Sequence, residues 1–324
     1  MKKHLALFAV SVLIFLYVTS LFGIDTVFSI VVRSNLSLVS AAVLCQVFIF
    51  VLYAMRFKTM ASKYKYVSLK DAFYIVTIGN LVNLLSPIVR IGGQPLMIYL
   101  TKGKIGSAKA SAVVITDTIS DMLSSVLIVV LTAIIFYSII PYQIMLPIAA
   151  FSVVTIVLIF GFTKFFLSKG VISRFSGWVR KRFKKRKSIF QAGVFTNSFK
   201  RVLEDKKIMS AGMGISFAIK FFEMLRMWLV FMAIGIPLSA TTLLIIWSFM
   251  LVIVMIPWLP GHLGLFEFSA SSAFILLGIV PQEAAGGVIL DRLVSFWFVI
   301  IFSLVVVWTS QHRLSELMSK TKNN

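Results

Sequence analysis

Charged residues are scarce in this sequence of 324 residues. They make up 13% of it, about half the share found in ordinary soluble domains. Apolar residues make up 59%, and the mean hydropathy is +0.99. This composition excludes an ordinary soluble globular domain and indicates an integral membrane protein built from helices.

Cysteine and histidine are nearly absent. Cys45 is the single cysteine, which excludes an intrachain disulfide and makes a cysteine-based metal site improbable. The three histidines, His4, His262 and His312, are too scattered to suggest a metal cluster. A Walker-type phosphate loop is also missing, so we expect no direct use of ATP. We therefore predict no metal and no cofactor.

Long apolar runs dominate what is present. A helix needs about 20 residues to cross ~30 Å of hydrocarbon. The first run follows Met-Lys-Lys-His but lacks a clear cleavage site, so we interpret it as a retained helix and not as a signal peptide. Six runs are long enough to span the membrane: Leu5–Phe22, Leu36–Met55, Ala110–Ile140, Ile144–Phe162, Ile208–Ile236 and Val288–Thr309.

Basic residues give the chain a net charge of +21 and are unevenly placed. Of the 32 lysines and arginines, 27 lie at the two termini and in the segments 56–70, 102–109 and 164–207. Cytoplasmic loops of membrane proteins are enriched in these residues. We expect a cell-membrane protein with both termini and the basic loop 164–207 in the cytoplasm. The loop should contact anionic lipids, and we expect no nucleic-acid partner.

This orientation forces two segments to return to the side they entered. Residues 72–101 and 243–280 each join two segments assigned to the same side, and both are interrupted by proline and glycine. We predict two re-entrant helical hairpins whose tips, around Pro87–Pro95 and Pro257–Gly264, are buried in protein or line a wet cavity. The expected fold is an all-α bundle with six full spans and two oppositely inserted hairpins, or eight spans if the hairpins cross fully.

An internal repeat accompanies the hairpins. A shift of 170 residues places Arg56 on Arg226, Pro87 on Pro257 and Asp121 on Asp291. We predict a single transmembrane domain, 1–324, made of inverted halves at about 1–140 and 144–310, the plan of many secondary transporters. Coincidence combined with ordinary proline kinks is the alternative.

Two motifs carry a family resemblance. They read Asn83-x-x-x-Pro87-x-x-Arg90-x-Gly92-Gly93-x-Pro95 and Pro257-x-x-Pro260-Gly261-x-x-Gly264-x-x-Glu267, the latter followed by Asp291-Arg292. The chain thereby resembles the lysylphosphatidylglycerol synthase transmembrane-region family of flippase-like membrane proteins. The resemblance implies a lipid-translocating module without the synthase domain. The chain departs from the family at His262, where a glycine is usual, and at Asp117-Thr118, where Glu-Arg is common.

Ionisable residues inside the apolar segments are the candidate site, because charges in a membrane mark functional sites. We expect a cationic path for a lipid phosphate, helped by backbone amides at the glycine-rich tips. Internal ion pairs that hold helices together are the structural alternative. Glu267 would cap the following helix or exchange a proton. The candidate substrate-binding residues are Arg90, Gly92, Gly93, Lys220, Glu223, Arg226, Gly261, Gly264, Glu267, Asp291 and Arg292, with Asp117 and Asp121 as charge partners.

The leading functional hypothesis is a non-enzymatic transporter that moves a phospholipid or a polyprenyl-phosphate-linked carrier between leaflets. A membrane-embedded transferase that holds Mg²⁺ on Asp117 and Asp121 is one alternative. A scaffold subunit of a lipid or glycolipid synthase is another.

Overall fold

The computed structural model describes residues 23–86, 92–167, 192–255 and 260–311, together with residues 10, 13, 14, 16, 17 and 20. Within these residues the chain is helical and contains no strand, as predicted. The helices are α2 Ile24–Val32, α3 Leu36–Ala61, α4 Leu69–Leu85, α5 Gln94–Ile105, α6 Ser107–Ile135, α7 Tyr142–Leu167, α9 Ala192–Leu203, α10 Lys206–Ala233, α11 Ala240–Met255, α12 Leu265–Leu276, α13 Pro281–Arg292 and α14 Phe298–Thr309.

Four of the described helices are long and apolar enough to cross a membrane: Leu36–Ala61, Ser107–Ile135, Tyr142–Phe165 and Pro281–Thr309. The last combines α13 and α14 through a π-helical turn at Leu293–Trp297. Helix α10 has 28 residues but carries three charged side chains near its middle. The protein is therefore a polytopic membrane bundle. The predicted run Leu5–Phe22 lies almost entirely outside the described residues.

Residues with clear capping roles set the helix boundaries. Asn35 accepts hydrogen bonds from two backbone N–H groups at the start of α3, and Asp205 does so once at the start of α10. Gly106, at φ +83°, separates α5 from α6, and Pro281 occupies the first turn of α13. The short helix α2 was not predicted, since nine residues are too few to register as a span.

The first interrupted segment forms a hairpin. Helix α4 ends at Leu85 and α5 begins at Gln94, so the segment is not one continuous helix. Asp71 at the start of α4 forms an ion pair with Lys104 at the end of α5, so the two open ends lie together. Near the tip, a Cβ on Gly93 would overlap the carbonyl of Gly79, which shows how closely the two backbones approach. The hairpin therefore returns to the side it entered.

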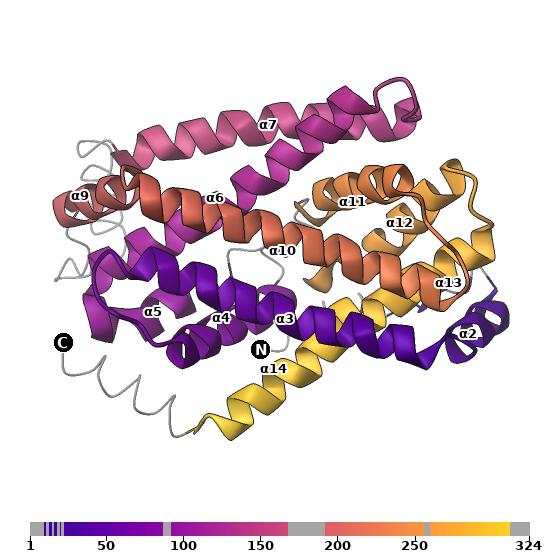
Figure 1. Ribbon diagram of the computed structural model, residues 1–324, viewed down its shortest axis with the longest axis horizontal. Coiled ribbons are helices and arrows are strands. Elements are labelled where there is room, and N and C mark those ends of the chain that lie inside the picture. The colour runs from indigo at the N-terminus through magenta and orange to yellow at the C-terminus, as the bar shows by residue number, and fades with distance from the viewer. Residues whose placement is uncertain are drawn as a thin grey trace.

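The second interrupted segment has the same organisation. Helix α11 ends at Met255, a short 3-10 turn covers Pro260–His262, and α12 begins at Leu265 and packs against α11. The pairs α4/α5 and α11/α12 lie toward opposite ends of the molecule (Figure 1). The predicted tip residues Pro87 and Pro257 lie outside the described residues.

Helices α3 and α10 form the centre of the bundle and run antiparallel along their full length (Figure 1). The backbone N–H of Asn35, before α3, donates to the carbonyl of Ala233, the last residue of α10, at 2.8 Å. At the other end, Lys63 contacts Asp205 at 2.5 Å. A shift of 170 residues exchanges these two contacts, because it places Asn35 on Asp205 and Lys63 on Ala233. The two helices are therefore related by a pseudo-two-fold axis.

The same shift relates the other elements. It places α2 on α9, α4 on α11, α5 on α12 and α6 on the α13–α14 span. The packing follows: α4 of the first hairpin packs against α14, while α11 of the second packs against α6. Each hairpin thus contacts the last helix of the opposite repeat. These elements lie within the predicted halves, whose outer limits at 1–140 and 144–310 stay a prediction.

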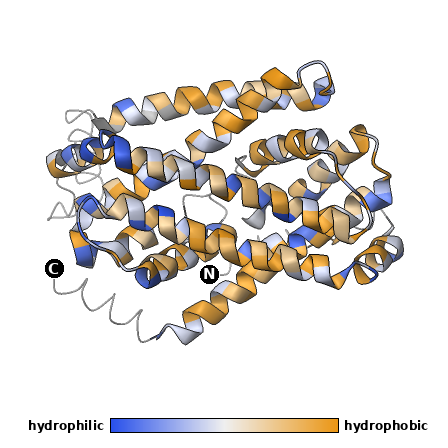
Figure 2. Ribbon diagram, in the orientation of Figure 1, coloured by the Kyte–Doolittle hydropathy of each residue, from blue (hydrophilic) through white to orange (hydrophobic). Residues whose placement is uncertain are grey.

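Hydrophilic residues gather at one end of the bundle, where α3 ends and α9 and α10 meet (Figure 2). That end includes Lys63, Lys65, Lys200, Arg201, Lys206 and Lys207. At the opposite end, around α2 and the start of α13, the described basic residue is Arg33. The bundle is therefore polarised in charge along its length.

Candidate functional site

The largest group of buried charges surrounds Arg56 of α3. Its guanidinium donates to Asp117 of α6 at 2.8 and 3.3 Å, to Asp121 at 2.9 Å and to the hydroxyl of Ser216 at 3.1 Å. The two aspartates are four residues apart, so they share one face of α6, as predicted. Arg56 is 3% exposed, so this cation lies in the interior and not in the basic segment 56–70 to which the sequence pattern assigned it.

Lys220 and Glu223 of α10 extend this group. Lys220 is completely buried near the middle of α10, about 20 Å from either end at 1.5 Å per residue. Its Nζ lies 3.0 Å from Asp121 and 3.5 Å from Glu223. The hydroxyl of Tyr53 donates to Glu223 at 2.9 Å. We define the central cluster as Arg56, Asp117, Asp121, Lys220 and Glu223.

A second ion pair lies on the other side of the pseudo-two-fold axis. Arg226 of α10 contacts Asp291 of α13 at 3.1 Å and donates to the side-chain oxygen of Gln46 at 2.6 Å. The repeat places Arg56 on Arg226, Asp121 on Asp291 and Gln46 on Ser216. Each arginine thus binds its own aspartate 65 residues later and a polar side chain on the opposite central helix. The residues that the shift of 170 positions matches in the sequence therefore make equivalent contacts in the structure.

A third pair joins the second hairpin to α13. Arg292 contacts Glu267 at 2.5 Å and donates to the carbonyl of Gly261, with its guanidinium over the rings of Phe266 and Phe296. Glu267 also accepts from the backbone N–H of Gly264 at 2.5 Å, so it caps α12. We call Arg292 and Glu267 the tip pair. It fixes the far end of the second hairpin to α13.

The glycine-rich tips show why small residues are needed there. Gly261 has φ +66°, and a Cβ would collide with Phe296. His262 adopts φ +58°, in the left-handed region that glycine occupies most easily. In the first hairpin the N–H of Gly93 donates to Asn83 at 2.7 Å, and Gly92 lies in the bend before α5. Arg90 lies outside the described residues.

The structure therefore brings most of the predicted charges together, but as ion pairs. Arg56 was missed as a site residue. So were the neutral residues Ser216, Tyr53 and Gln46, which bind Arg56, Glu223 and Arg226 in that order. Two signals in the sequence pointed to Arg56: its match to Arg226, and the lack of a nearby cation for Asp117 and Asp121. Asp117 and Asp121, to which the transferase alternative assigned Mg²⁺, both bind Arg56. In the described part of the chain, no three His, Cys, Asp or Glu side chains are placed to hold a metal.

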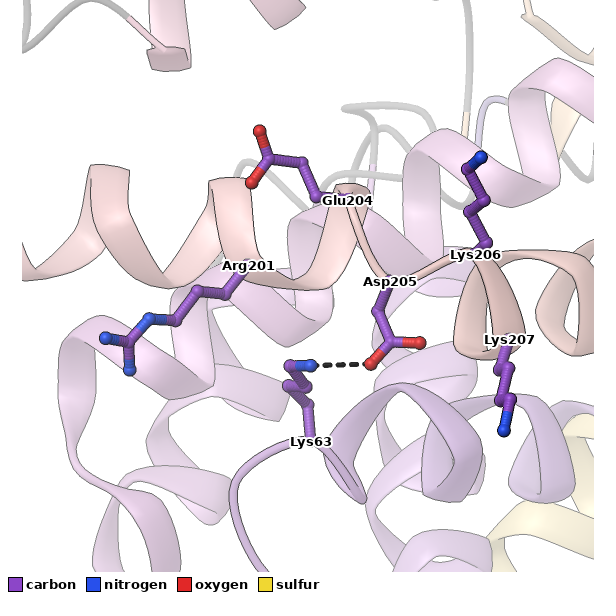
Figure 3. A pocket seen from close by; sticks show the side chains of 6 residues that line it. All are labelled: Lys63, Arg201, Glu204, Asp205, Lys206 and Lys207. Carbon is purple, nitrogen blue, oxygen red and sulfur yellow. Dashed lines mark hydrogen bonds and ion pairs between the residues drawn. The ribbon is translucent and has the colours of Figure 1, made fainter.

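Two shallow hollows occupy equivalent positions at the ends of the α3/α10 pair. One, of about 470 Å³, opens at the basic end, where Lys63 points toward Asp205 (Figure 3). The other, of about 530 Å³, opens at the opposite end. The first is lined by Lys63, Arg201, Glu204, Asp205, Lys206 and Lys207, and the second by Ser29, Ile30, Arg33, Asn35, Ala233, Ile234 and Gly235. Equivalent parts of the two repeats form both hollows, but the first is lined by more charged side chains.

The sequence is similar to known proteins over most of its length. A family model of the lysylphosphatidylglycerol synthase TM region matches residues 5–303. A UPF0104 membrane protein of Methanothermobacter thermautotrophicus is 27% identical over 267 residues, 78% of this chain and 79% of its own length. UPF0104 membrane proteins of Pyrococcus horikoshii and Methanocaldococcus jannaschii are 25% and 22% identical. The first alignment covers 95% of this chain and 97% of the relative, and the second covers 98% of both.

Proposed function

Because the chain belongs to the family of the lysylphosphatidylglycerol synthase TM region, we propose that it is a non-enzymatic transporter that moves a phosphate-bearing lipid between membrane leaflets. The lipid is a phospholipid or a polyprenyl-phosphate-linked carrier. The observation that carries this proposal is the pair of broken hairpins at opposite ends of a pseudo-two-fold bundle, with buried charges between them. This is the arrangement of transporters that bind a substrate near the membrane midplane.

The buried charged groups can stabilise a lipid headgroup inside the bundle. A phosphate crossing ~30 Å of hydrocarbon needs polar partners, and an isolated charge there is costly. Arg226 is one such partner, because its side chain is 11% exposed and its guanidinium can exchange Asp291 for a lipid phosphate. Arg90, in the first hairpin tip, is the second partner we propose. The acyl chains stay in the surrounding lipid.

The charge polarity of the bundle gives the orientation. We propose that the basic end and both termini face the cytoplasm of a cell membrane, because positive residues are retained on that side. The hollow lined by Lys63 and Arg201 would then lie at the inner-leaflet headgroups, where anionic lipids are attracted. We propose anionic lipids as partners there, and a lipid or glycolipid synthase as a possible source of the substrate.

Lipid exchange in proteoliposomes tests the proposal. Purified protein is reconstituted with a fluorescent phosphatidylglycerol or with a polyprenyl-phosphate-linked carrier, and exchange between leaflets is followed with and without Mg²⁺. We expect faster exchange than in protein-free vesicles for at least one of these lipids, with no requirement for Mg²⁺. Exchange at the protein-free rate for both lipids would contradict the proposal.

Variants of Arg226 separate a lipid-binding role from a structural one. Arg226→Gln alone leaves Asp291 buried without its cation, so lost exchange would not be informative by itself. The double variant Arg226→Gln/Asp291→Asn removes both charges and should fold stably. If Arg226 binds lipid phosphate, this double variant should exchange lipid much more slowly at an unchanged melting temperature. Arg33→Gln, an exposed cation after α2, is the matched control and should exchange normally.

A further inference from the structure

The two central arginines use the same edge of their guanidinium groups differently. Nε and Nη2 form the edge of an arginine that can hold both oxygens of a carboxylate or a phosphate. Asp117 fills this edge of Arg56, accepting from Nε at 2.8 Å and from Nη2 at 3.3 Å. Asp291 contacts Nη2 of Arg226 at 3.1 Å, but Nε is buried and has no hydrogen-bond partner among the described residues. The edge that is fully used in the first site is therefore half used in the second.

One position of the repeat accounts for this difference. A shift of 170 residues places Asp117 on Gly287, so α13 has no carboxylate at the equivalent position. It also places Ala61 on Phe231, and a Cβ on Gly287 would lie 2.5 Å from the Phe231 ring. The first site thus combines a small residue with an aspartate, and the second combines an aromatic ring with a glycine.

The guanidinium of Arg226 is held in place with one donor left over. Its Nη1 donates to Gln46 at 2.6 Å, and its Nη2 contacts Asp291. A buried N–H group without an acceptor is costly, because it has lost its water and gained no partner. The Nε group is therefore a fixed donor for an acceptor that the described residues do not supply.

We propose that the Nε–Nη2 edge of Arg226 binds the phosphate of the transported lipid, in the place that Asp117 fills beside Arg56. This inference rests on the proposed lipid transport and assigns the phosphate to one of the two central arginines. A lipid phosphodiester has two unesterified oxygens, which match the two donors of this edge. Arg56 is not a second such site, because Asp117 already occupies the equivalent edge.

The first site shows that an arginine in this position can bind two anions. Arg56 holds Asp117 on its Nε–Nη2 edge and Asp121 on Nη1 at 2.9 Å. In the second site Asp291 can release Nη2 to the phosphate, because the hydroxyl of Ser295 still donates to this aspartate at 3.2 Å. Binding therefore exchanges one contact of the guanidinium and gives Nε its acceptor.

The ring of Phe231 is the gate to this place. Gly287 lies four residues before Asp291, so the ring covers the face of α13 that carries this aspartate. Phe231 is buried and packs against Phe274 of α12, with the ring centroids 4.3 Å apart. Because α12 belongs to the second hairpin, a movement of that hairpin shifts the ring and exposes the edge of the guanidinium.

Lipid binding to the purified protein tests the site without any transport. Native mass spectrometry in detergent compares phosphatidylglycerol and a polyprenyl monophosphate with diacylglycerol, which lacks a phosphate. We expect at least one of the two phosphate-bearing lipids to bind more tightly than diacylglycerol. Arg226→Lys keeps the charge beside Asp291 but lacks the two-donor edge, so its affinity for that lipid should fall at least about tenfold at an unchanged melting temperature. Equal affinities of Arg226→Lys and the unaltered protein would overturn the proposal.

Two further variants test where the phosphate lies. Phe231→Ala removes the gate and should bind the lipid at least as tightly as the unaltered protein. Phe231→Ala/Gly287→Asn adds a neutral amide oxygen in the place of Asp117, which should accept from Nε and weaken binding to the level of Arg226→Lys. Both variants lack the same ring, so equal binding by the two would reject this place for the phosphate. If loss of the ring prevents folding, Arg226→Lys alone decides.

Lipid exchange by Arg226→Lys separates this site from the proposed function. Weaker binding in this variant, together with no lipid exchange by the unaltered protein, keeps the phosphate site and rejects the proposed transport. Equal binding and equal exchange rates in the variant and the unaltered protein keep lipid transport and reject the phosphate site at Arg226.

Discussion

Two regions on either side of the pseudo-two-fold axis share one motif and use it differently. In each, an arginine on a central helix binds an aspartate 65 residues later and a polar side chain across the axis. Around Arg226 the group stops there and is neutral. Around Arg56 it gains Asp117, Lys220 and Glu223, which extend it into a larger cluster of buried charges. The repeat accounts for the shared arginine–aspartate pair, and the departures from it account for the additional charges around Arg56.

The largest expected effect comes from removing Arg56, because it binds two aspartates whereas Arg226 binds one. Arg56→Gln leaves both Asp117 and Asp121 without their guanidinium, and we expect a loss of about 3–5 kcal/mol in the free energy of unfolding. Arg226→Gln should cost less, because a single aspartate loses its cation and Ser295 still donates to it. Denaturation of purified variants in detergent measures both.

Replacing the arginine and both of its aspartates with neutral residues makes this comparison sharper. The triple variant Arg56→Gln/Asp117→Asn/Asp121→Asn removes all three charges and should recover much of the lost stability. If Arg56→Gln were no less stable than Arg226→Gln, the two sites would be equivalent in energy and the central cluster would not be the main electrostatic centre.

The hairpins offer a second comparison, in backbone packing. The repeat places Gly79 and Gly93 of the first hairpin on Phe249 and Leu263 of the second, which are buried side chains. At these equivalent positions, which the structure describes in both hairpins, the first hairpin therefore joins its two arms backbone to backbone and the second does not. Gly93→Ala should lower stability by about 1–3 kcal/mol, because its methyl group would overlap the carbonyl of Gly79.

Gly214→Ala is the matched control for that substitution. Gly214 lies inside α10, and a Cβ there has no neighbour within 4 Å, so alanine should stabilise the helix by up to about 1 kcal/mol. Equal melting temperatures for the two variants would contradict the close approach of the hairpin arms.

The smallest expected effect concerns the two ends of the α3/α10 pair. Lys63 and backbone N–H groups lower the pKa of Asp205 below its ordinary value of 3.8, whereas Asn35 at the equivalent position carries no charge. A lowered pKa stabilises the fold above the pKa of the unfolded carboxyl, and the benefit disappears as the pH falls through the folded pKa. Asp205→Asn should keep the cap, melt slightly lower at neutral pH and match the unaltered protein in acid. A difference that persists in acid would reject this assignment.

Much of the fold was predictable from the sequence, because lipid demands long apolar helices and the basic residues mark one side. The runs at Leu36–Met55 and Ile208–Ile236 became α3 and α10, and proline with glycine located both hairpins. The repeat was visible through a few matched residues, of which Arg226 and Asp291 proved to be partners.

The partners of the buried charges were not predictable to the same extent. Arg56 lies close to the lysines that follow α3, so its charge pattern resembles a membrane-surface residue. Its burial depends on how α3, α6 and α10 pack against one another, and this packing cannot be predicted from the residues next to Arg56 in the sequence. The shared partner of Asp117 and Asp121 became clear only once Arg56 was placed between them. The position of Arg90 and the side on which each end of the bundle lies stay predictions.

The central claim is that equivalent positions of the two repeats lie on opposite sides of the membrane. Leu36 and Lys206 begin the equivalent helices α3 and α10, and both are exposed. Leu36→Cys and Lys206→Cys, each made in a Cys45→Ala background, can be labelled in intact cells with a membrane-impermeant thiol reagent. The account predicts that position 36 is labelled from outside and position 206 only after the membrane is permeabilised. Labelling of both positions from the same side would contradict the inverted repeat and the transport mechanism built on it.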